Sequence, residues 1–343
     1  MNEYTLHQGD CLEVLPTLAA NSIHCVVTSP PYFGLRDYGH DDQIGLEPTP
    51  EQYVSKLVNV FSHVWRVLRD DGTVWLNLGD SYWGGKGKSG YELPHEAAER
   101  KGKTLQTSHN MPGYMDMRPS DGRHPTIKPK DLIGIPWRVA LALQADGWWL
   151  RSDIIWHKPN PMPESVTDRP TKAHEYIFLL TKSARYFYDA DAVREKYTRP
   201  LDRWGGDTTK ETDQTKGNQF AVMERQGRER RPDPAGRNHR SVWTIATAPY
   251  AGAHFATFPP KLVEPCILAG CPVGGTVLDP FAGSGTVGVV VCKTQRKFVG
   301  IELNADYCKL AQQRIDAAAR QMRMDFDPLP DLADGVLDEA IGE

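Results

Sequence analysis

The chain of 343 residues is 40% hydrophobic and 24% charged, a globular composition that suits two average domains or one large α/β domain with an inserted segment. It contains no apolar run of 18 residues and no basic-then-apolar leader, so we expect neither membrane insertion nor secretion, and a cytoplasmic location. The net charge of −4 does not exclude a nucleic-acid partner, because local charge decides contact with phosphates and residues 321–343 alone carry a balance of −6.

The first two predicted strands each end at a candidate site. Tyr4–Asp10 is typical of a short strand that ends in an acid, and a helix follows from about Cys11 to Ala19. The run Ile23–Val27 has the length and the β-branched content of a buried strand. The turn Thr28–Tyr32 comes directly after it, so we expect this turn at the carboxyl end of the strand, where α/β sheets bind their ligands.

This turn, Thr28-Ser29-Pro30-Pro31-Tyr32, is predicted to be stiff. Two prolines fix φ near about −65° and remove two backbone donors, which leaves the carbonyls of Ser29 and Pro30 as rigid acceptors. Rigid acceptors suit a ligand that brings its own donors, such as the exocyclic amino group of a nucleobase, and Tyr32 offers a flat face for a planar base. Taken alone, the turn could also be a rigid exit from a core strand.

The middle of the chain alternates helical and extended patterns. Apolar residues at three-and-four spacing predict an amphipathic helix over Glu51–Leu68, ended by Asp71-Gly72, and Thr73–Leu78 is predicted to be the next strand. Asp80 follows this strand and is expected either to line a pocket or to cap a turn. Beyond them we predict a helix over Leu132–Ala145 and strands over Trp148–Trp156 and Glu175–Leu180.

Two polar segments interrupt this pattern. Residues 84–130 hold nine Lys and Arg against five acids, and residues 192–242 hold twelve against eight, so each carries a local charge of +4. Loops of this length inside a compact domain are usually functional or disordered. We therefore expect either interaction surfaces or solvated linkers at these two places.

The C-terminal third returns to regular structure. Regular structure is predicted to resume at Val242–Ile245. His254–Lys261 leads into a predicted helix, and Lys297–Ile301 is typical of a buried strand. Asn304 is expected to cap a last long helix that runs to Met322.

A glycine-rich turn lies between these elements. Gly275–Thr286 is typical of a strand, a turn and the start of a helix, and Gly283, Gly285 and Gly288 fit the pattern G-x-G-x-x-G. Glu302 closes the next strand, where a carboxylate could bind ribose hydroxyls. By itself this fingerprint fits a dinucleotide site as well as any other nucleoside site.

The residue sequences of the two turns are more specific than the Pro-Pro turn or the G-x-G-x-x-G pattern taken alone. Ser-Pro-Pro-Tyr at Ser29–Tyr32 and Phe-Ala-Gly-Ser-Gly at Phe281–Gly285 resemble the catalytic and cofactor loops of the DNA methyltransferases that methylate amino groups. The catalytic loop comes about 250 residues before the cofactor loop, an order that resembles the family's beta group, and the resemblance runs from about Tyr4 to about Ala318. It implies an α/β fold with a Rossmann-like, doubly wound, mostly parallel sheet in circularly permuted order and an inserted target-recognition region.

The resemblance also implies a reaction and a set of site residues. The expected reaction moves a methyl group from S-adenosyl-L-methionine to N4 of cytosine or N6 of adenine in a base extruded from double-stranded DNA. The implied catalytic residues are Ser29, Pro30, Pro31 and Tyr32. The implied cofactor-binding residues are Asp10, Thr257, Phe258, Asp279, Phe281, Ala282, Gly283, Ser284, Gly285, Thr286 and Glu302, with a helix N-cap as the alternative role of Asp10.

Contact with DNA is expected from the basic segments. Arginine suits both phosphate binding and the reading of guanine, whereas a disordered charged loop is the alternative for residues 192–242. Residues 84–130 are expected to form a flap that faces DNA, or else a solvated linker. The candidate DNA-binding residues are Arg36, Arg225, Arg228, Arg230, Arg231, Arg237 and Arg240.

These expectations divide the chain into parts. Residues 1–191 form the catalytic half of one methyltransferase domain, residues 192–242 the target-recognition region, residues 243–322 the cofactor half and residues 323–343 an acidic tail. By analogy with the beta group we expect a homodimer, and a cognate restriction endonuclease is a further candidate partner that the sequence itself does not reveal. The six cysteines show no C-x-x-C pair, so we expect buried reduced thiols and no metal.

Several alternatives stay open at this point. Serine in the first position of the catalytic loop favours N4 of cytosine over N6 of adenine. Methylation of RNA or of a protein glutamine is a second alternative, since related Asn-Pro-Pro-Tyr loops occur there. A nicotinamide-dependent oxidoreductase would explain the glycines but neither the Ser-Pro-Pro-Tyr turn nor the basic segments, and a DNA-binding partner without activity would need a degenerate cofactor site.

Overall fold

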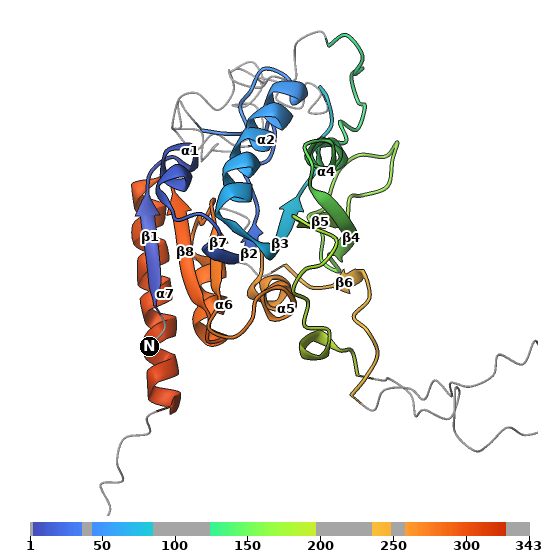
Figure 1. The fold of residues 1–343 in the computed structure, drawn as a ribbon. Helices are drawn as coiled ribbons and strands as arrows, with labels where there is room; N and C mark the ends of the chain where they lie inside the picture. Colours follow the sequence, from blue (N-terminus) through green and yellow to red (C-terminus); the bar gives the residue numbers. More distant parts are fainter. Residues whose placement is uncertain (1–2, 36–42, 85–123, 197–234, 248–257, 327–343) are drawn as a thin grey trace, which may run out of the picture.

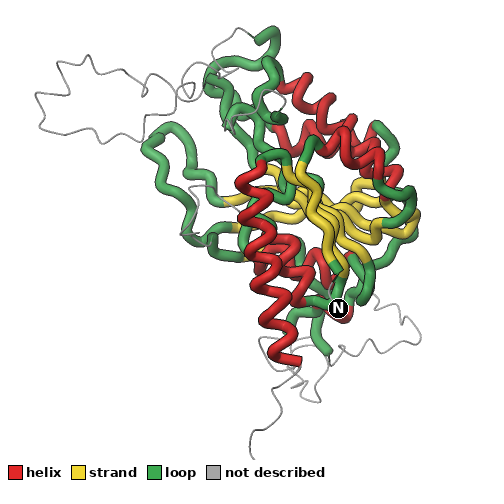
Figure 2. Tube along the Cα trace, turned by 90° about the vertical axis from the view of Figure 1, so that its left-hand side faces the viewer, coloured by secondary structure: helices red, strands yellow, loops and turns green. Residues whose placement is uncertain are grey.

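One eight-stranded sheet runs through the protein, with helices on both of its faces (Figures 1 and 2). The computed structural model describes residues 3–35, 43–84, 124–196, 235–247 and 258–326, with side chains up to residue 321. The strands are β1 (Tyr4–Gln8), β2 (Ile23–Thr28), β3 (Leu68–Leu78), β4 (Trp149–His157), β5 (His174–Thr181), β6 (Val242–Thr244), β7 (Thr276–Asp279) and β8 (Lys297–Glu302). The helices are α1 (Cys11–Val14), α2 (Pro50–Val67), α4 (Ile135–Ala145), α5 (Pro260–Gly270), α6 (Thr286–Lys293) and α7 (Ala305–Phe326), with short 3₁₀ helices η1 (Leu15–Thr17) and η3 (Asp191–Val193).

The strand order is β1-β8-β7-β2-β3-β5-β4-β6. All neighbouring strands are parallel except β5, which runs antiparallel to both β3 and β4. The predicted mostly parallel α/β sheet is therefore confirmed. Strands from the N-terminal half (β2) and the C-terminal half (β7) pair in the middle of the sheet, as the permuted order requires.

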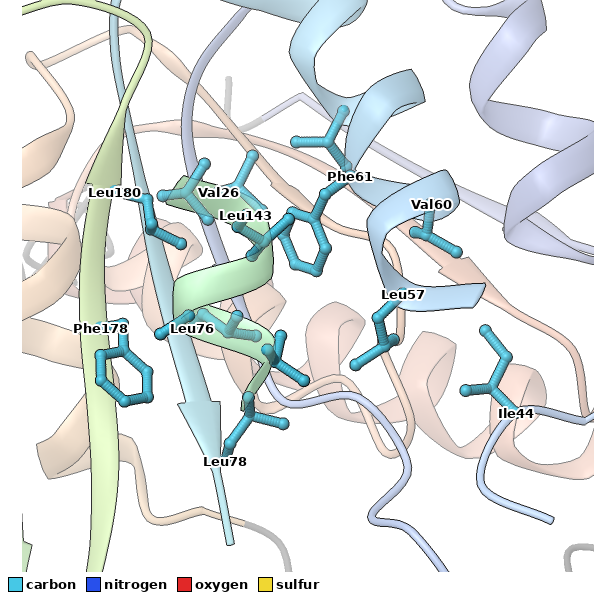
Figure 3. Close-up of a cluster of buried hydrophobic side chains, with 14 of the residues drawn as sticks. Val26, Ile44, Leu57, Val60, Phe61, Leu76, Leu78, Leu143, Phe178 and Leu180 are labelled. Carbon is cyan, nitrogen blue, oxygen red and sulfur yellow. The ribbon is translucent and has the colours of Figure 1, made fainter. Parts of the chain in front are cut away.

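Alternate residues of the central strands enter two separate cores. Figure 3 shows Val26 of β2, Leu76 and Leu78 of β3, and Phe178 and Leu180 of β5 facing the side chains of α2 and α4. Their sequence neighbours on the same strands point to the opposite face, where they pack with α5, α6 and α7. Because side chains alternate across a strand and both faces are covered, these strands are apolar almost throughout.

Local chemistry explains where two of the elements differ from the prediction. The predicted helix over Cys11–Ala19 is α1 followed by η1, because Pro16 has no N–H to donate and the last turn tightens into a 3₁₀ helix. The predicted gap between the second helix and its following strand is absent. Leu68 ends α2 with extended backbone (ψ 139°) and already pairs with Ile23, so β3 begins there rather than at Thr73.

Capping side chains fix the starts of two helices. Thr49 accepts a hydrogen bond from the Gln52 amide at 3.3 Å at the start of α2, where Pro50 takes the first helical position. Asn304 accepts hydrogen bonds from the amides of Asp306 (2.8 Å) and Tyr307 (3.2 Å), which confirms it as the cap of α7. Within the described ranges, no helix has the length and apolar character needed to cross a membrane.

Candidate active site

The two candidate loops leave adjoining strands at the same edge of the sheet. β2 and β7 pair directly, with Cys25 opposite Val277 and Val26 opposite Leu278. At their carboxyl ends the Thr28 hydroxyl donates a hydrogen bond of 2.7 Å to Asp279 Oδ1, which joins residues 251 positions apart. The Ser29–Tyr32 and Phe281–Gly285 loops therefore lie together at this edge of the sheet.

Asp279 is a buried carboxyl group between these loops, with 1% of its surface exposed. It also accepts a hydrogen bond from the Phe281 amide at 3.1 Å. Burial raises the pKa of Asp279 to about 7, against the lowering effect of its two hydrogen bonds, and the nearby Glu302 carboxylate raises it further. Asp279 therefore ties the end of β2 to the first residues of the cofactor loop.

Glu302, at the end of β8, holds the glycine loop from the other side. Its Oε2 accepts from the Gly283 amide at 2.7 Å and its Oε1 from the Asn304 amide at 2.8 Å. Gly283 (φ +52°) and Gly285 (φ +77°) have left-handed backbone that favours glycine. A Cβ at Gly285 would also lie 2.8 Å from the Ala311 Cβ, whereas at Gly283 nothing nearer than 3.9 Å would oppose it, so one side of the loop is open.

Arg314 of α7 supports the same loop from behind. Its Nη1 donates to the Ser284 hydroxyl at 2.6 Å and contacts the Thr286 hydroxyl at 3.4 Å. Ser284 and Thr286 are themselves buried, with 6% and 5% exposure. These two predicted cofactor residues thus help to hold the loop's shape.

A partly buried polar network lies behind the Ser29–Tyr32 loop. The Ser29 hydroxyl donates to Asn77 Oδ1 at 3.2 Å, and its oxygen lies 3.4 Å from the Tyr32 hydroxyl. Tyr32 donates to Glu175 Oε2 at 2.7 Å, and Asn77 Nδ2 donates to the same oxygen at 3.2 Å. Burial, and then the Glu175 carboxylate, raise the pKa of Tyr32 well above its ordinary value, so its hydroxyl keeps its proton.

Lys158, directly after the end of β4, pairs with the acid of this network. Its Nζ forms an ion pair with Glu175 Oε1 and lies 4.2 Å from the centre of the Trp156 ring. Both members of the ion pair are largely buried, with 18% and 14% of the side chain exposed for Lys158 and Glu175. The Glu175 carboxylate is thus both ion-paired and hydrogen-bonded beneath Tyr32, as a buried charge requires.

Packing fixes the place of the Tyr32 ring. A Cβ added at Gly79, just beyond β3, would lie 2.4 Å from Tyr32 Cε2, so the ring packs directly on the glycine backbone. The Tyr53 hydroxyl of α2 donates to the Pro31 carbonyl at 2.8 Å, which anchors the loop on the helix beside it. The Pro-Pro-Tyr segment is therefore held from both sides.

Two predicted acids act as caps. Asp10 accepts from the Leu12 amide at 2.8 Å as the N-cap of α1, which is the alternative role expected for it. Asp80 Oδ1 accepts from the amides of Ser81 (2.9 Å), Gly134 (3.0 Å) and Ile135 (3.0 Å), and so joins the end of β3 to the start of α4. For Asp80 the turn-capping role is the one observed.

Phe258 lies beside the catalytic loop. It lines a small, mainly apolar pocket that reaches Thr28 and Asn77. The other walls of this pocket come from β2, β3, β5 and α5, through Val27, Trp75, Ile177, Leu262, Val263 and Cys266. Its predicted neighbour Thr257 lies outside the described residues.

Two of the predicted DNA-binding arginines are described, and they share one partner. Arg237 Nε and Arg240 Nε each lie 2.9 Å from Glu195 Oε2, and Glu195 pairs with Arg237 in an isolated β-bridge. This cluster joins the described residues on either side of 197–234. The candidates Arg36, Arg225, Arg228, Arg230 and Arg231 lie outside the described residues.

All six cysteines are free thiols, and five of them are buried. Burial raises the pKa of the Cys266 thiol far above the range in which a thiolate forms, and raises that of Cys11 to about 12. Among the residues with described positions, no group of three or more His, Cys, Asp or Glu side chains could hold a metal ion.

Sequence reasoning missed three residues of this site, Lys158, Glu175 and Arg314. The sequence predicts Glu175 only as the first residue of a strand. Because β5 runs antiparallel to its neighbours, its first residues lie at the edge where the parallel strands end. No local pattern indicates that reversal, although a charged residue at the start of an apolar strand is a weak signal.

Comparison with known proteins identifies the class to which this fold and site belong. The family model for N6/N4 DNA methylases matches residues 23–313, which is most of the chain. The chain therefore belongs to the DNA methylase family, and the predicted resemblance to the beta-group amino-methyltransferases is confirmed.

Individual relatives are similar over nearly their whole length. The chain is 48% identical to the Type II methyltransferase M.Cfr9I of Citrobacter freundii, over 92% of this chain and 88% of that protein. It is 45% identical to the Type II methyltransferase M.SmaI of Serratia marcescens, over 90% of this chain and 89% of that protein. Among solved structures, the cytosine-N4-specific PvuII DNA methyltransferase shares the fold, with a TM-score of 0.58 and 18% identity over 94% of this chain and 93% of that chain.

Proposed function

We propose that this DNA methylase transfers a methyl group from S-adenosyl-L-methionine to the exocyclic amino group of a base extruded from double-stranded DNA. The observation that carries this proposal is the meeting of the Ser-Pro-Pro-Tyr and glycine loops at one sheet edge, joined by the hydrogen bond from Thr28 to Asp279. An amine held by the first loop would then lie close to a methyl donor held by the second.

The residues around the glycine loop fit this cofactor. The side of the loop at Gly283 is open, and the Glu302 carboxylate uses one acceptor position on each oxygen for backbone amides. Glu302 closes its strand where a carboxylate in nucleoside sites accepts from ribose hydroxyls, and it would take that role here. When bound, S-adenosyl-L-methionine supplies an electrophilic methyl group. Asp279, Phe281, Ala282 and Phe258 would line the rest of the site.

The Ser-Pro-Pro-Tyr loop supplies the groups that activate the amine. An exocyclic amine donates its lone pair into the ring, so it becomes nucleophilic only when its N–H groups are held out of that conjugation. The Ser29 hydroxyl oxygen and the Pro30 carbonyl would accept these N–H groups and stabilise the positive charge that develops on nitrogen. The Tyr32 ring, fixed by Gly79 and Glu175, would stack on the base and offset part of the cost of extrusion.

We infer that N4 of cytosine is the target, with N6 of adenine as the alternative. Serine in the first loop position supports cytosine, because it is more usual among the N4 enzymes, whereas Asp or Asn is more usual among the N6 enzymes. Mass spectrometry of nucleosides from DNA treated with the purified protein identifies the base. Detection of N6-methyladenine without N4-methylcytosine would establish the alternative.

Substitution of Ser29 tests the assignment of the catalytic loop. We expect Ser29→Ala to bind S-adenosyl-L-methionine normally by isothermal titration but to lose at least about a hundred-fold in the rate of tritiated-methyl transfer, as for loss of one transition-state hydrogen bond. Ser62→Ala, an exposed serine on α2, is the matched control and should be fully active. A fully active Ser29→Ala variant would refute the assignment.

We further propose that residues 192–242 carry target recognition and that the protein acts in the cytoplasm as part of a restriction-modification pair. The Type II names of the relatives support a restriction context for those proteins. Protection of host DNA from a co-expressed nuclease would test the pairing. The proposed homodimer is tested by light scattering, in which a mass of one chain at working concentration would exclude it.

A further inference from the structure

In the proposed reaction the Ser29 hydroxyl must accept a hydrogen bond, and a serine hydroxyl alone does not ensure that it acts as the acceptor. A serine hydroxyl has one proton and can donate or accept, so it accepts an N–H from the target amine only if its proton is directed elsewhere. Where that proton goes depends on the polar groups around Ser29 Oγ. Two such groups lie within hydrogen-bond distance in the described structure, Asn77 Oδ1 at 3.2 Å and the Tyr32 hydroxyl at 3.4 Å.

The orientation of the Asn77 amide is fixed by its other contacts. Asn77 has 5% of its surface exposed, and its Nδ2 donates to the Tyr176 carbonyl at 3.1 Å and to Glu175 Oε2 at 3.2 Å. Turning the amide over would place its oxygen against these two acceptors and leave buried polar groups without partners. Asn77 therefore presents its oxygen, an acceptor, to Ser29.

The Tyr32 hydroxyl also presents an acceptor to Ser29, because its proton points elsewhere. Its single proton has two acceptors, Glu175 Oε2 at 2.7 Å and Asn77 Oδ1 at 3.1 Å, and burial, which raises the pKa of Tyr32, keeps that proton in place. Only the lone pairs of its oxygen are left to face Ser29. Glu175 can receive both donors because Lys158 pairs with its other oxygen. Both polar neighbours of Ser29 are thus acceptors.

We propose that Asn77, oriented by Glu175, is a positioning residue of the methyl transfer, which takes the Ser29 proton so that the lone pairs of Ser29 face the substrate amine. The inference rests on the proposed function, in which Ser29 accepts an N–H from the base. The order of hydrogen bonds then runs in one direction, from the amine to Ser29 and from Ser29 to Asn77. Glu175 and its partner Lys158 act one step further back, by holding Asn77 and Tyr32.

The test compares single-turnover rates of methyl transfer with enzyme in excess over a DNA duplex. Asn77→Leu removes the acceptor at similar volume, and we expect its rate to fall at least about ten-fold while its affinity for S-adenosyl-L-methionine stays within about two-fold. Asn77→Asp should recover part of the loss, because a carboxyl group that shares a proton with Glu175 still donates to it and still accepts from Ser29. Asn59→Leu, on the exposed face of α2, controls for the substitution itself.

A double-mutant cycle shows whether Asn77 acts through Ser29. If it does, Ser29→Ala combined with Asn77→Leu is no slower than Ser29→Ala alone, because the proton that Asn77 directs is already absent. Additive losses, equal losses in Asn77→Asp and Asn77→Leu, or an unchanged rate in Asn77→Leu would each overturn the inference. A fully active Ser29→Ala variant would instead refute the proposed function, so the two failures are distinguishable.

Discussion

At the scale of single residues, the site depends on close approaches that only certain side chains allow. Gly79 is the clearest case, because the Tyr32 ring lies where its Cβ would be. The backbone at Gly79 is not in the left-handed region, so glycine is required there for space and not for conformation. The position of the ring, and with it the face that the proposed function assigns to a base, is therefore set by the absence of one methyl group.

Gly79→Ala should displace the Tyr32 ring without unfolding the protein. We expect methyl transfer to slow by at least about ten-fold, because misplacement of a positioning group by about 1 Å is costly in a catalytic site. Cofactor affinity, measured by isothermal titration, should stay unchanged, since the glycine loop is formed by other strands. A variant with the wild-type rate would show that the ring's position is unimportant.

The buried carboxyl of Asp279 should make the stability of the protein depend on pH. Burial raises its pKa from 3.8 to about 7 in the folded protein, so the unfolded chain releases this proton at lower pH than the folded protein does. Raising the pH from the unfolded pKa to the folded pKa of Asp279 therefore lowers the free energy of unfolding. This loss levels off above the folded pKa. Between about pH 5 and about pH 8, the expected loss is roughly 2–3 kcal/mol.

Urea unfolding of the wild type and of Asp279→Asn at several pH values measures this effect. The variant lacks the titrating group, so the stability of the wild type should fall relative to it as the pH rises. A constant difference between the two proteins across this range would contradict the prediction.

At the scale of elements, hydrogen bonds between the ends of helices and strands hold the site in place. The N-terminus of α4 is joined to β3 by Asp80, and the loop before α6 is joined to α7 by Arg314. Helical periodicity predicted these helices, but it could not predict such connections. They join residues about 30 to 55 positions apart, and they exist only once the helices are packed.

Replacement of Arg314 by methionine tests the support that α7 gives to the cofactor loop. Methionine keeps much of the aliphatic length but removes the hydrogen bonds to Ser284 and Thr286. We expect the affinity for S-adenosyl-L-methionine to fall by about five- to ten-fold, the effect of roughly one lost hydrogen bond. Lys309→Met, on an exposed part of the same helix, should bind normally in the same titration, and an equal loss in both variants would count against the prediction.

At the scale of the whole molecule, the two halves of the chain share one sheet. The pairing of β2 with β7 and the core against α5 and α6 combine residues from the first 80 positions with residues beyond 258. Cys25 of β2 is packed in that shared core together with Cys266, Cys271 and Cys292 from the C-terminal half. Neither half can bury these side chains alone.

Thiol reactivity should report on this shared core. With a disulfide reagent such as Ellman's, the native protein should show at most one readily reactive thiol, the half-buried Cys308, because the other five are buried. All six should react after denaturation in urea. Rapid reaction of several thiols in the native protein would show that the two halves separate easily.

The sequence by itself determined the buried strands and the two loops that follow them, because these depend on local apolar patterns and on turn chemistry. It also placed Asn304 and the acids Asp10 and Asp80 at element ends. Only the tertiary structure decided that β5 is reversed, and so brought Glu175 and Lys158 beneath Tyr32. Hydrogen bonds between residues some 100 positions apart depend on strand direction and register, which no short stretch of sequence contains.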